Sequence, residues 1–225
     1  PELRRIADLV GRGLLPPGPS NACLQAWQAH ARSGRPQALD HFFVQAGLLT
    51  PTQAAIVARE SILTRQPFRN YRLLRHAGEG GMAIVYEATY VPLKVRVALK
   101  VLDTAFCLQD AYRLRFRREA QILLALDHDH IVEGREYVTE DGVDFYAMSF
   151  VDGVSVLDVI TKDGRLAERL ALQVALQTAS ALSHMHEKGI VHRDIKPANL
   201  VLDHEGDVHL IDFGLAKVMA GMRQD

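Results

Sequence analysis

Residues 192–199 read HRDIKPAN, and residues 212–214 read DFG. A single motif of this length can arise by chance, so its meaning depends on what lies upstream and in which order. Working outward, three further features precede the two motifs: a glutamate in a predicted helix, a lysine that ends an apolar run, and a glycine-rich stretch. Each is ambiguous alone.

The glycine-rich stretch, residues 78–88, reads GEGGMAIVYEA and resembles the pattern G-x-G-x-x-G, with Ala83 in place of the third glycine. It lies between two predicted strands, which argues against a Rossmann fingerprint because that motif leads into a helix. No GKS or GKT occurs, which excludes a Walker loop. A glycine loop between strands can bring backbone N–H groups close to phosphate oxygens, but a plain hairpin turn explains it equally well.

The run VALK (97–100) ends a predicted strand with Lys100. A lysine in this position can neutralise phosphate charge if a carboxylate holds its amine in place. Glu119 follows 19 residues later (119 − 100) in the predicted helix, on the same side as Ile122 and Leu123. We therefore expect Glu119 to pair with Lys100.

The five features follow one another in the order of the protein-kinase signature. Over roughly residues 71–217 the sequence closely resembles the eukaryotic-type (bacterial Hanks-type) serine/threonine protein kinases. The resemblance implies an α+β fold with two lobes, and a kinase domain at 67–225. An antiparallel sheet with one helix is expected at about 71–148, and an incomplete helical lobe at about 149–225.

The hydrophobic periodicity agrees with this order of elements. Strands are expected at 71–80, 83–91, 94–102, 131–138, 143–151, 199–202 and 207–211, and helices at 110–126 and 166–187. In the second helix, one side is expected to carry Leu170, Val174, Gln177, Ala181 and His184.

The resemblance also implies catalytic roles. Lys100, braced by Glu119, is expected to bind the α- and β-phosphates of ATP. Asp194 is expected to orient the substrate hydroxyl and accept its proton. Lys196 is expected to contact the γ-phosphate, as in the serine/threonine-specific form of this loop.

The nucleotide and metal sites follow from the same resemblance. Asp212 and Asn199 are expected to bind Mg²⁺. Ala83 is expected to affect nucleotide handling only modestly, because alanine tolerates β geometry at the start of the second strand. The residues expected to contact the nucleotide are Gly78, Glu79, Gly80, Gly81, Val85, Ala98, Lys100, Met148, Phe150 and Val201.

The predicted function is ATP-dependent phosphorylation of serine or threonine hydroxyls on proteins. The alternative is a nucleotide-binding pseudokinase or scaffold, although such proteins usually lack one of the five key residues and none is missing here. A small-molecule kinase of the aminoglycoside type ranks lower, because those enzymes rarely carry HRDIKPAN whole. The sequence ends at Asp225 without an A-P-E motif. We therefore expect a truncation within the activation segment and a fragment that is not fully competent.

The composition describes an ordinary globular chain. It has 225 residues, 48% hydrophobic and 24% charged, with a net charge of −1, so nothing favours nucleic acid as a partner. The two cysteines, Cys23 and Cys107, fit no metal motif and are expected to be reduced thiols in a cytoplasmic protein. No apolar run is long enough to span a bilayer.

Residues 1–66 are expected to form a separate module of four short helices and a linker. The sequence TPTQ (50–53) has the pattern of a helix start, and Trp27 is expected in the module core. The stretch GLLTPTQA, followed by YRLL and GEGG, resembles segments that precede the kinase domain in some planctomycete kinases. A partner-binding role, a regulatory role and a structural cap all stay open.

Three other polar clusters have simpler structural interpretations. DHDH (127–130) lies where kinases carry a turn after the helix, and HMH (184–186) lies at the end of the helix before HRDIKPAN. Both are expected to be structural rather than metal-binding. The arginines of YRLRFRREA (112–120) are expected to form a solvated helix face, with contact to a phosphorylated activation segment as the lesser alternative.

Overall fold

The computed structural model describes most of the chain from Phe68 onward and only short stretches before it. The described residues are 10, 15, 22, 24–29, 39–50, 68–103, 106–107, 109–140 and 143–218. Within these ranges, no helix combines the length and apolarity needed to cross a membrane.

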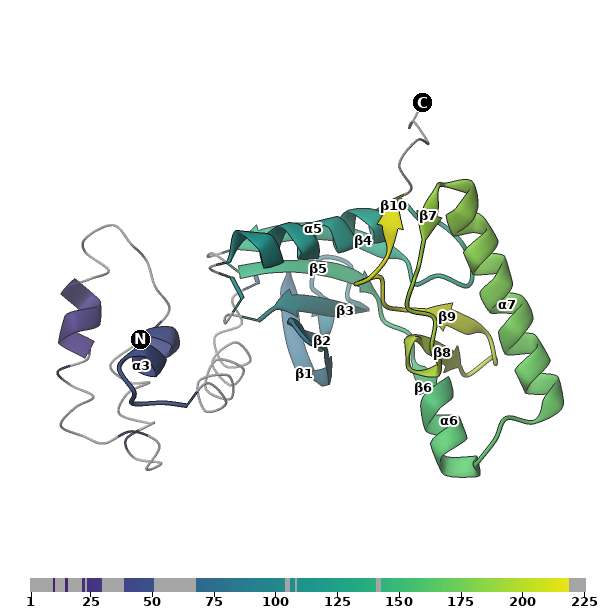
Figure 1. Ribbon diagram of the computed structural model, residues 1–225, viewed down its shortest axis with the longest axis horizontal. Helices are drawn as coiled ribbons and strands as arrows, with labels where there is room; N and C mark the ends of the chain where they lie inside the picture. The colour runs from purple at the N-terminus through teal and green to yellow at the C-terminus, as the bar shows by residue number, and fades with distance from the viewer. Residues whose placement is uncertain are drawn as a thin grey trace.

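The first lobe is a five-stranded antiparallel sheet in the order β1-β2-β3-β5-β4 (Figure 1). Its strands are β1 (Tyr71–Glu79), β2 (Ala83–Tyr90), β3 (Val95–Leu102), β4 (Gly134–Glu140) and β5 (Val143–Ser149). All five expected strands are confirmed. Only β4 starts clearly later than expected, because Ile131 and Val132 pair with Leu210 of the second lobe instead.

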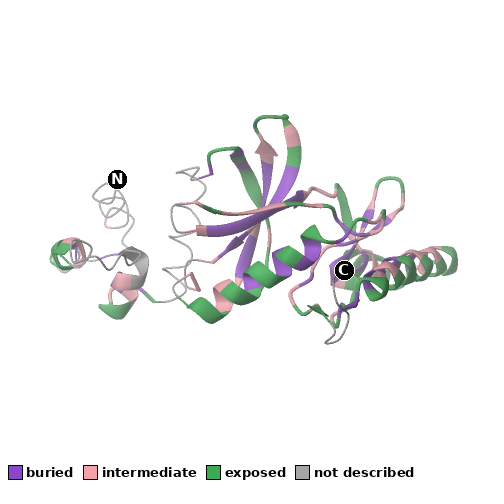
Figure 2. Ribbon diagram, turned by 90° about the horizontal axis from the view of Figure 1, so that it is seen from above, coloured by how far each residue is buried: buried purple, intermediate pink, exposed green. Residues whose placement is uncertain are grey.

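The alternation of side chains along the strands separates two hydrophobic clusters. In β3, Val97, Leu99 and Val101 pack into one cluster, and Ala98 and Leu102 pack into the other. This second cluster also contains the buried apolar residues of helix α5 (Asp110–Leu124). Lys100 lies two residues after Ala98 and therefore on the same face of the strand, so its side chain points toward α5. Figure 2 shows how the buried residues concentrate along the strands.

The second lobe consists of two helices and two small sheets (Figure 1). The first sheet joins β6 (Gly153–Ser155), β8 (Leu200–Asp203) and β9 (Val208–Leu210), and the second joins β7 (Ile190–Val191) and β10 (Lys217–Val218). The helices are α6 (Val156–Asp163) and α7 (Glu168–Glu187), and the short 3-10 helix η1 (Pro197–Asn199) precedes β8.

The expected helix α7 and the strands β8 and β9 are confirmed, but the face expected for α7 was only partly right. Its buried residues are Val174, Thr178, Ala181 and Met185, whereas Leu170, Gln177 and His184 are only partly buried. Helix α6 and the strands β6, β7 and β10 were not expected. The signal for α6 was present: the Ser155 hydroxyl caps its start at the Asp158 N–H, and Gly164 ends it with φ 76°.

In the N-terminal module, the structure describes one of the expected helices in full, α3 (Leu39–Gln45). Leu15, Leu24, Phe43 and Leu49 are buried together, and Trp27 packs against them. This agrees with a core position for Trp27. The rest of the four-helix prediction, including Pro51 to Gln53 of the TPTQ start, lies outside the described residues.

Candidate active site

The centre of the candidate site is an ion-pair network around Lys100. Its Nζ lies 2.5 Å from Glu119 Oε1 and 2.9 Å from Asp212 Oδ1. Burial disfavours the charged amine, but the two carboxylates outweigh burial and raise the pKa of Lys100 above its usual value. Burial also opposes ionisation of Asp212, yet Lys100 and the Gly214 N–H more than offset it and lower the pKa of Asp212. The lysine is therefore charged and fixed at neutral pH.

Glu119 is positioned by a second donor that the sequence analysis missed. The Tyr146 hydroxyl donates to Glu119 Oε1 at 2.7 Å, and the Glu119 side chain is only 1% exposed. Tyr146 lies directly opposite Lys100 in the pairing of β3 with β5. The available signal was a tyrosine hydroxyl on a mostly apolar strand. Burial raises the pKa of Tyr146 well above its usual value, so the hydroxyl keeps the proton that it donates.

The second part of the site is the loop HRDIKPAN. Asp194 Oδ2 accepts from Lys196 Nζ at 2.7 Å and from Asn199 Nδ2 at 3.1 Å. Asn199 Nδ2 also donates to the Asp194 carbonyl at 2.9 Å, because η1 folds the asparagine back over the loop. The hydrogen bond from Lys196 is the main cause that lowers the pKa of Asp194. Arg193 has φ 69°, a left-handed conformation that indicates a constrained backbone.

The two motifs are joined to each other. The Ile211 N–H donates to the Asn199 carbonyl at 3.1 Å, directly before Asp212. The His192 and Phe213 rings are both buried and meet edge to face at 5.3 Å between centroids. Both rings therefore serve packing between the two motifs. The Lys100 network and the Asp194 loop therefore belong to one connected site.

The glycine-rich stretch forms the turn between β1 and β2. Gly80 donates its N–H to the Ala83 carbonyl at 2.8 Å. A Cβ added at Gly78 or Gly81 would meet no heavy atom within 4 Å, so the backbone borders open space. Ala83 begins β2, as expected, and is only 2% exposed.

A family model of the protein kinase domain matches residues 71–224. The chain belongs to the protein kinase family. It is 40% identical over 150 residues to the serine/threonine-protein kinase PrkC of Bacillus subtilis, an alignment that covers 67% of this chain and 23% of PrkC. It is 38% identical over 154 residues to PknB of Mycolicibacterium smegmatis, covering 67% of this chain and 25% of that kinase. The chain thus spans about a quarter of the length of these relatives.

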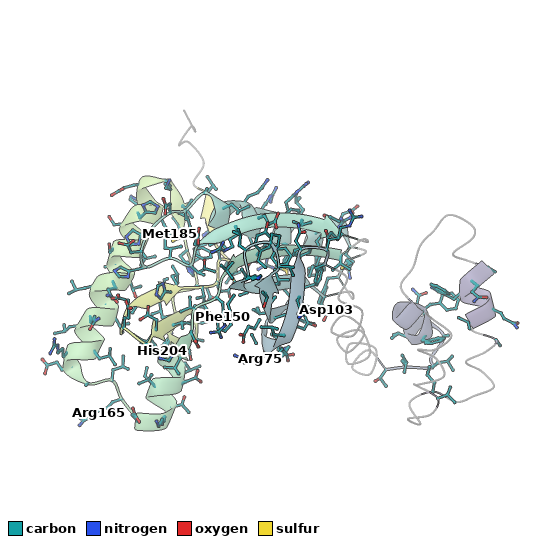
Figure 3. All side chains as sticks on the ribbon, turned by 180° about the vertical axis from the view of Figure 1, so that it is seen from behind. Arg75, Asp103, Phe150, Arg165, Met185 and His204 are labelled. Carbon is teal, nitrogen blue, oxygen red and sulfur yellow. The ribbon has the colours of Figure 1, made fainter. Side chains whose placement is uncertain are left out.

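Four of the residues expected around the adenine of a kinase nucleotide, Val85, Ala98, Met148 and Phe150, belong to one hydrophobic cluster. Ala98 and Met148 are paired across β3 and β5, and Val85 packs against the same cluster. Phe150, labelled in Figure 3, follows β5 in the connecting segment and lies beneath the Arg96 guanidinium at 4.5 Å. Val201 is half-buried on β8 in the second lobe.

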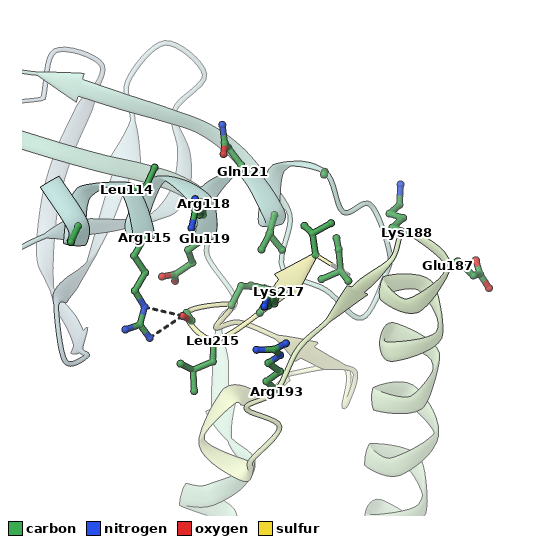
Figure 4. A pocket seen from close by; sticks show the side chains of 18 residues that line it. Leu114, Arg115, Arg118, Glu119, Gln121, Glu187, Lys188, Arg193, Leu215 and Lys217 are labelled. Carbon is green, nitrogen blue, oxygen red and sulfur yellow. Dashed lines mark hydrogen bonds between the residues drawn. The ribbon is translucent and has the colours of Figure 1, made fainter. Parts of the chain in front are cut away.

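A cleft of about 1190 Å³ lies beside this site, between α5 and the segment that follows Gly214 (Figure 4). Five cationic side chains line it: Arg115, Arg118, Lys188, Arg193 and Lys217. Arg115 donates to the Gly214 carbonyl at 3.2 and 3.4 Å. Arg115 is exposed, as expected for a solvated arginine face, and adds this bond to the segment after Asp212. The prediction of a merely solvated face was wrong for Arg113, which bonds to the buried Asp144.

Contacts within the protein are made by His128, His130 and His184 of DHDH and HMH. His128 Nε2 lies 3.0 Å from Ser180 Oγ, and His128 Nδ1 accepts from the His130 N–H at 3.0 Å. The His184 ring lies 5.2 Å from the His128 ring. These contacts connect the turn after α5 to α7. Within the described residues, no cluster of three or more histidine, cysteine or acidic side chains has a geometry suited to a metal ion.

Proposed function

We propose that the protein transfers the γ-phosphoryl group of ATP to serine or threonine hydroxyls of protein substrates. The single observation that carries this proposal is the connected site in which Lys100 is paired with Glu119 and Asp212, next to the Asp194 loop. In protein kinases this arrangement positions phosphates and neutralises their charge, and phosphoryl transfer needs little covalent help beyond that.

Lys100 and the glycine turn are the groups assigned to the phosphates. The lysine is charged, and the open backbone at Gly78 and Gly81 lets N–H groups approach oxygen atoms. Val85, Ala98, Met148, Phe150 and Val201 are assigned to the adenine, and Glu79 and Gly80 belong with Gly78 and Gly81 to the phosphate-binding turn.

Mg²⁺ fits the donor set at the base of the site. Asp212 and Asn199 offer hard oxygen ligands, which Mg²⁺ prefers, and the Asp212 side chain is still 36% exposed. When bound, Mg²⁺ supplies charge neutralisation at the phosphates. On the protein side, Asp194 accepts the proton of the substrate hydroxyl, and its low pKa keeps it ionised for that role. Lys196 supplies a positive charge beside it.

In this family, an arginine directly before the catalytic aspartate, here Arg193, goes with a phosphorylated activation segment. The cationic cleft beside α5 suits such a segment. Arg115, Arg193 and Lys217 approach it from three different elements. New arginine–phosphate pairs are a common way in which kinase activation loops become ordered.

The test measures transfer of radiolabelled phosphate from ATP to a generic protein substrate by the full-length gene product. Asp194→Asn is expected to reduce the rate by roughly 10²–10⁴-fold while MgATP still binds, because only the proton acceptor is lost. An undiminished rate would refute the assignment of Asp194. Tight MgATP binding by the unmodified protein with no phosphoprotein formed would instead favour a pseudokinase.

A further inference from the structure

Asp144 is a buried carboxylate that the proposed chemistry does not use. It lies on β5, and its side chain is 0% exposed. Three donor residues from two other elements, α5 and β4, point at it. Arg113 Nε donates at 2.6 Å and Nη2 at 3.3 Å, the Tyr137 hydroxyl at 2.9 Å, and Thr139 Oγ1 at 2.5 Å. A buried charge is tolerated only when it is paired and hydrogen-bonded, so this network requires each of its members.

Asp144 stays ionised in this setting. Burial alone would raise its pKa, but the hydrogen bonds from Arg113, Thr139 and Tyr137 outweigh burial and lower it. Among the described residues, Arg113 is the only cationic side chain in salt-bridge contact with Asp144. The fork of a guanidinium fixes both direction and distance, unlike the point charge of a lysine.

Arg113 lies in the first turn of α5, where other polar attachments are few. The preceding Gln109 occupies the N-cap position and makes no side-chain capping bond. Further along the helix, Phe116 packs against the Tyr146 ring at 5.2 Å, and the Arg117 guanidinium lies 5.4 Å from the Tyr137 ring. These ring contacts tolerate sliding, whereas a two-pronged ion pair to a buried carboxylate does not.

Glu119 belongs to the same helix, six residues after Arg113, or about 9 Å along the axis at about 1.5 Å per residue. Side-chain ends lie about 5–6 Å from a helix axis, so a rotation of about 30° displaces a carboxylate by about 3 Å. A contact of 2.5 Å between Lys100 and Glu119 does not survive such a displacement. The position of α5 therefore decides whether the active-site ion pair exists.

We propose that the Arg113–Asp144 ion pair is a positioning pair that fixes the rotation and axial position of α5, and so keeps Glu119 in contact with Lys100. Loss of the pair should weaken nucleotide binding, an effect that rests on the proposed function. It should also free the Lys100 amine from Glu119, an effect that does not rest on that function and can be measured without nucleotide.

The experiment compares Arg113→Met and Asp144→Asn with the unmodified full-length protein, each in the natural background and in Glu119→Gln. The first readout is the reactivity of the Lys100 amine toward limited acetylation without nucleotide, quantified by mass spectrometry. We expect both variants to increase that reactivity several-fold, and to have little further effect in Glu119→Gln, where the contact is already weakened. Arg113→Lys should restore part of the protection. Arg117→Met, which loses a contact to Tyr137 but none to Asp144, is the matched control and should behave as the unmodified protein.

The second readout is the dissociation constant for MgATP, expected to rise by about fivefold to tenfold only when Glu119 is present, the range of coupling within one network. Urea unfolding identifies any variant that fails to fold. Asp144→Asn was chosen to limit that risk, because asparagine keeps the shape of the side chain. Unchanged Lys100 reactivity in folded variants, or equal effects in both backgrounds, would overturn the positioning role. Increased reactivity in a protein that binds no MgATP would support the positioning role and refute the proposed function.

Discussion

Replacing Ala83 by glycine restores the usual third glycine of the loop and is expected to cost stability rather than to improve nucleotide binding. Ala83 is the first residue of β2, lies opposite Leu102 of β3 and is only 2% exposed. Its methyl group is therefore buried. Losing one buried methyl group costs about 0.8 kcal/mol. Glycine in a strand costs roughly 0.5–1 kcal/mol more in backbone entropy. The free energy of unfolding should therefore fall by about 1.3–1.8 kcal/mol, or about 3–7 °C in Tm for a domain of this size.

The nucleotide affinity should hardly change, because Ala83 contacts the turn through its backbone. Its carbonyl accepts from the Gly80 N–H, and glycine keeps that carbonyl. Urea unfolding measures the loss of stability, and calorimetric titration with MgATP measures the nucleotide affinity. Ala77→Gly, at an exposed position of β1, is the control for the entropy contribution alone. A tenfold change in the dissociation constant, about 1.4 kcal/mol, would refute this account of the loop.

Two further predictions concern stability. Tyr146→Phe should reduce the free energy of unfolding by about 1–3 kcal/mol in urea titrations, because the buried Glu119 carboxylate loses a donor; an unchanged value would show that Tyr146 does not support Glu119. The second concerns pH. Burial, helped by His184 and His130, lowers the pKa of His128 more than Asp129 raises it, so below about pH 6.5 the unfolded chain takes up a proton that the folded chain resists. Stability should therefore fall between pH 7.5 and 5.5, and His128→Asn should make that fall smaller. A slope identical to that of the unmodified protein would contradict this.

Much of the fold was predictable because strand alternation and motif order are local properties. The run from Val95 to Leu102 alternates so regularly that both its faces, and the direction of Lys100, follow from the sequence. The Lys100–Glu119 pair was likewise predictable from an apolar strand, a helical face and the family pattern. Helix α6 was missed although Ser155 and Gly164 marked its two ends, because its short length left little periodicity.

Other features depend on partners that are distant in the chain. Leucines lie on more than one side of α7, and Leu172 and Leu176 are 60% and 72% exposed, so periodicity alone did not identify the buried side. Arg113 looked like one more exposed arginine because Asp144, its partner, lies 31 residues away on another element. The one local signal was a charged residue inside the apolar strand VDFYAMS. Such a residue indicates a buried network, but the sequence does not identify its donors.

The charges of the central network also bear on what the site can bind. Lys100 meets two carboxylates, so the chain's own groups carry one positive and two negative charges there. A triphosphate brought to this network alone would meet net negative charge in a partly buried place, where electrostatic interactions are stronger than in water. An ammonium has three N–H donors, and Glu119 and Asp212 engage two of them. The third is left for a phosphate oxygen, and only a cation at Asp212 reverses the sign of the charge. From the contacts that hold Lys100 in place, we therefore expect nucleotide binding at this site to depend on a divalent cation.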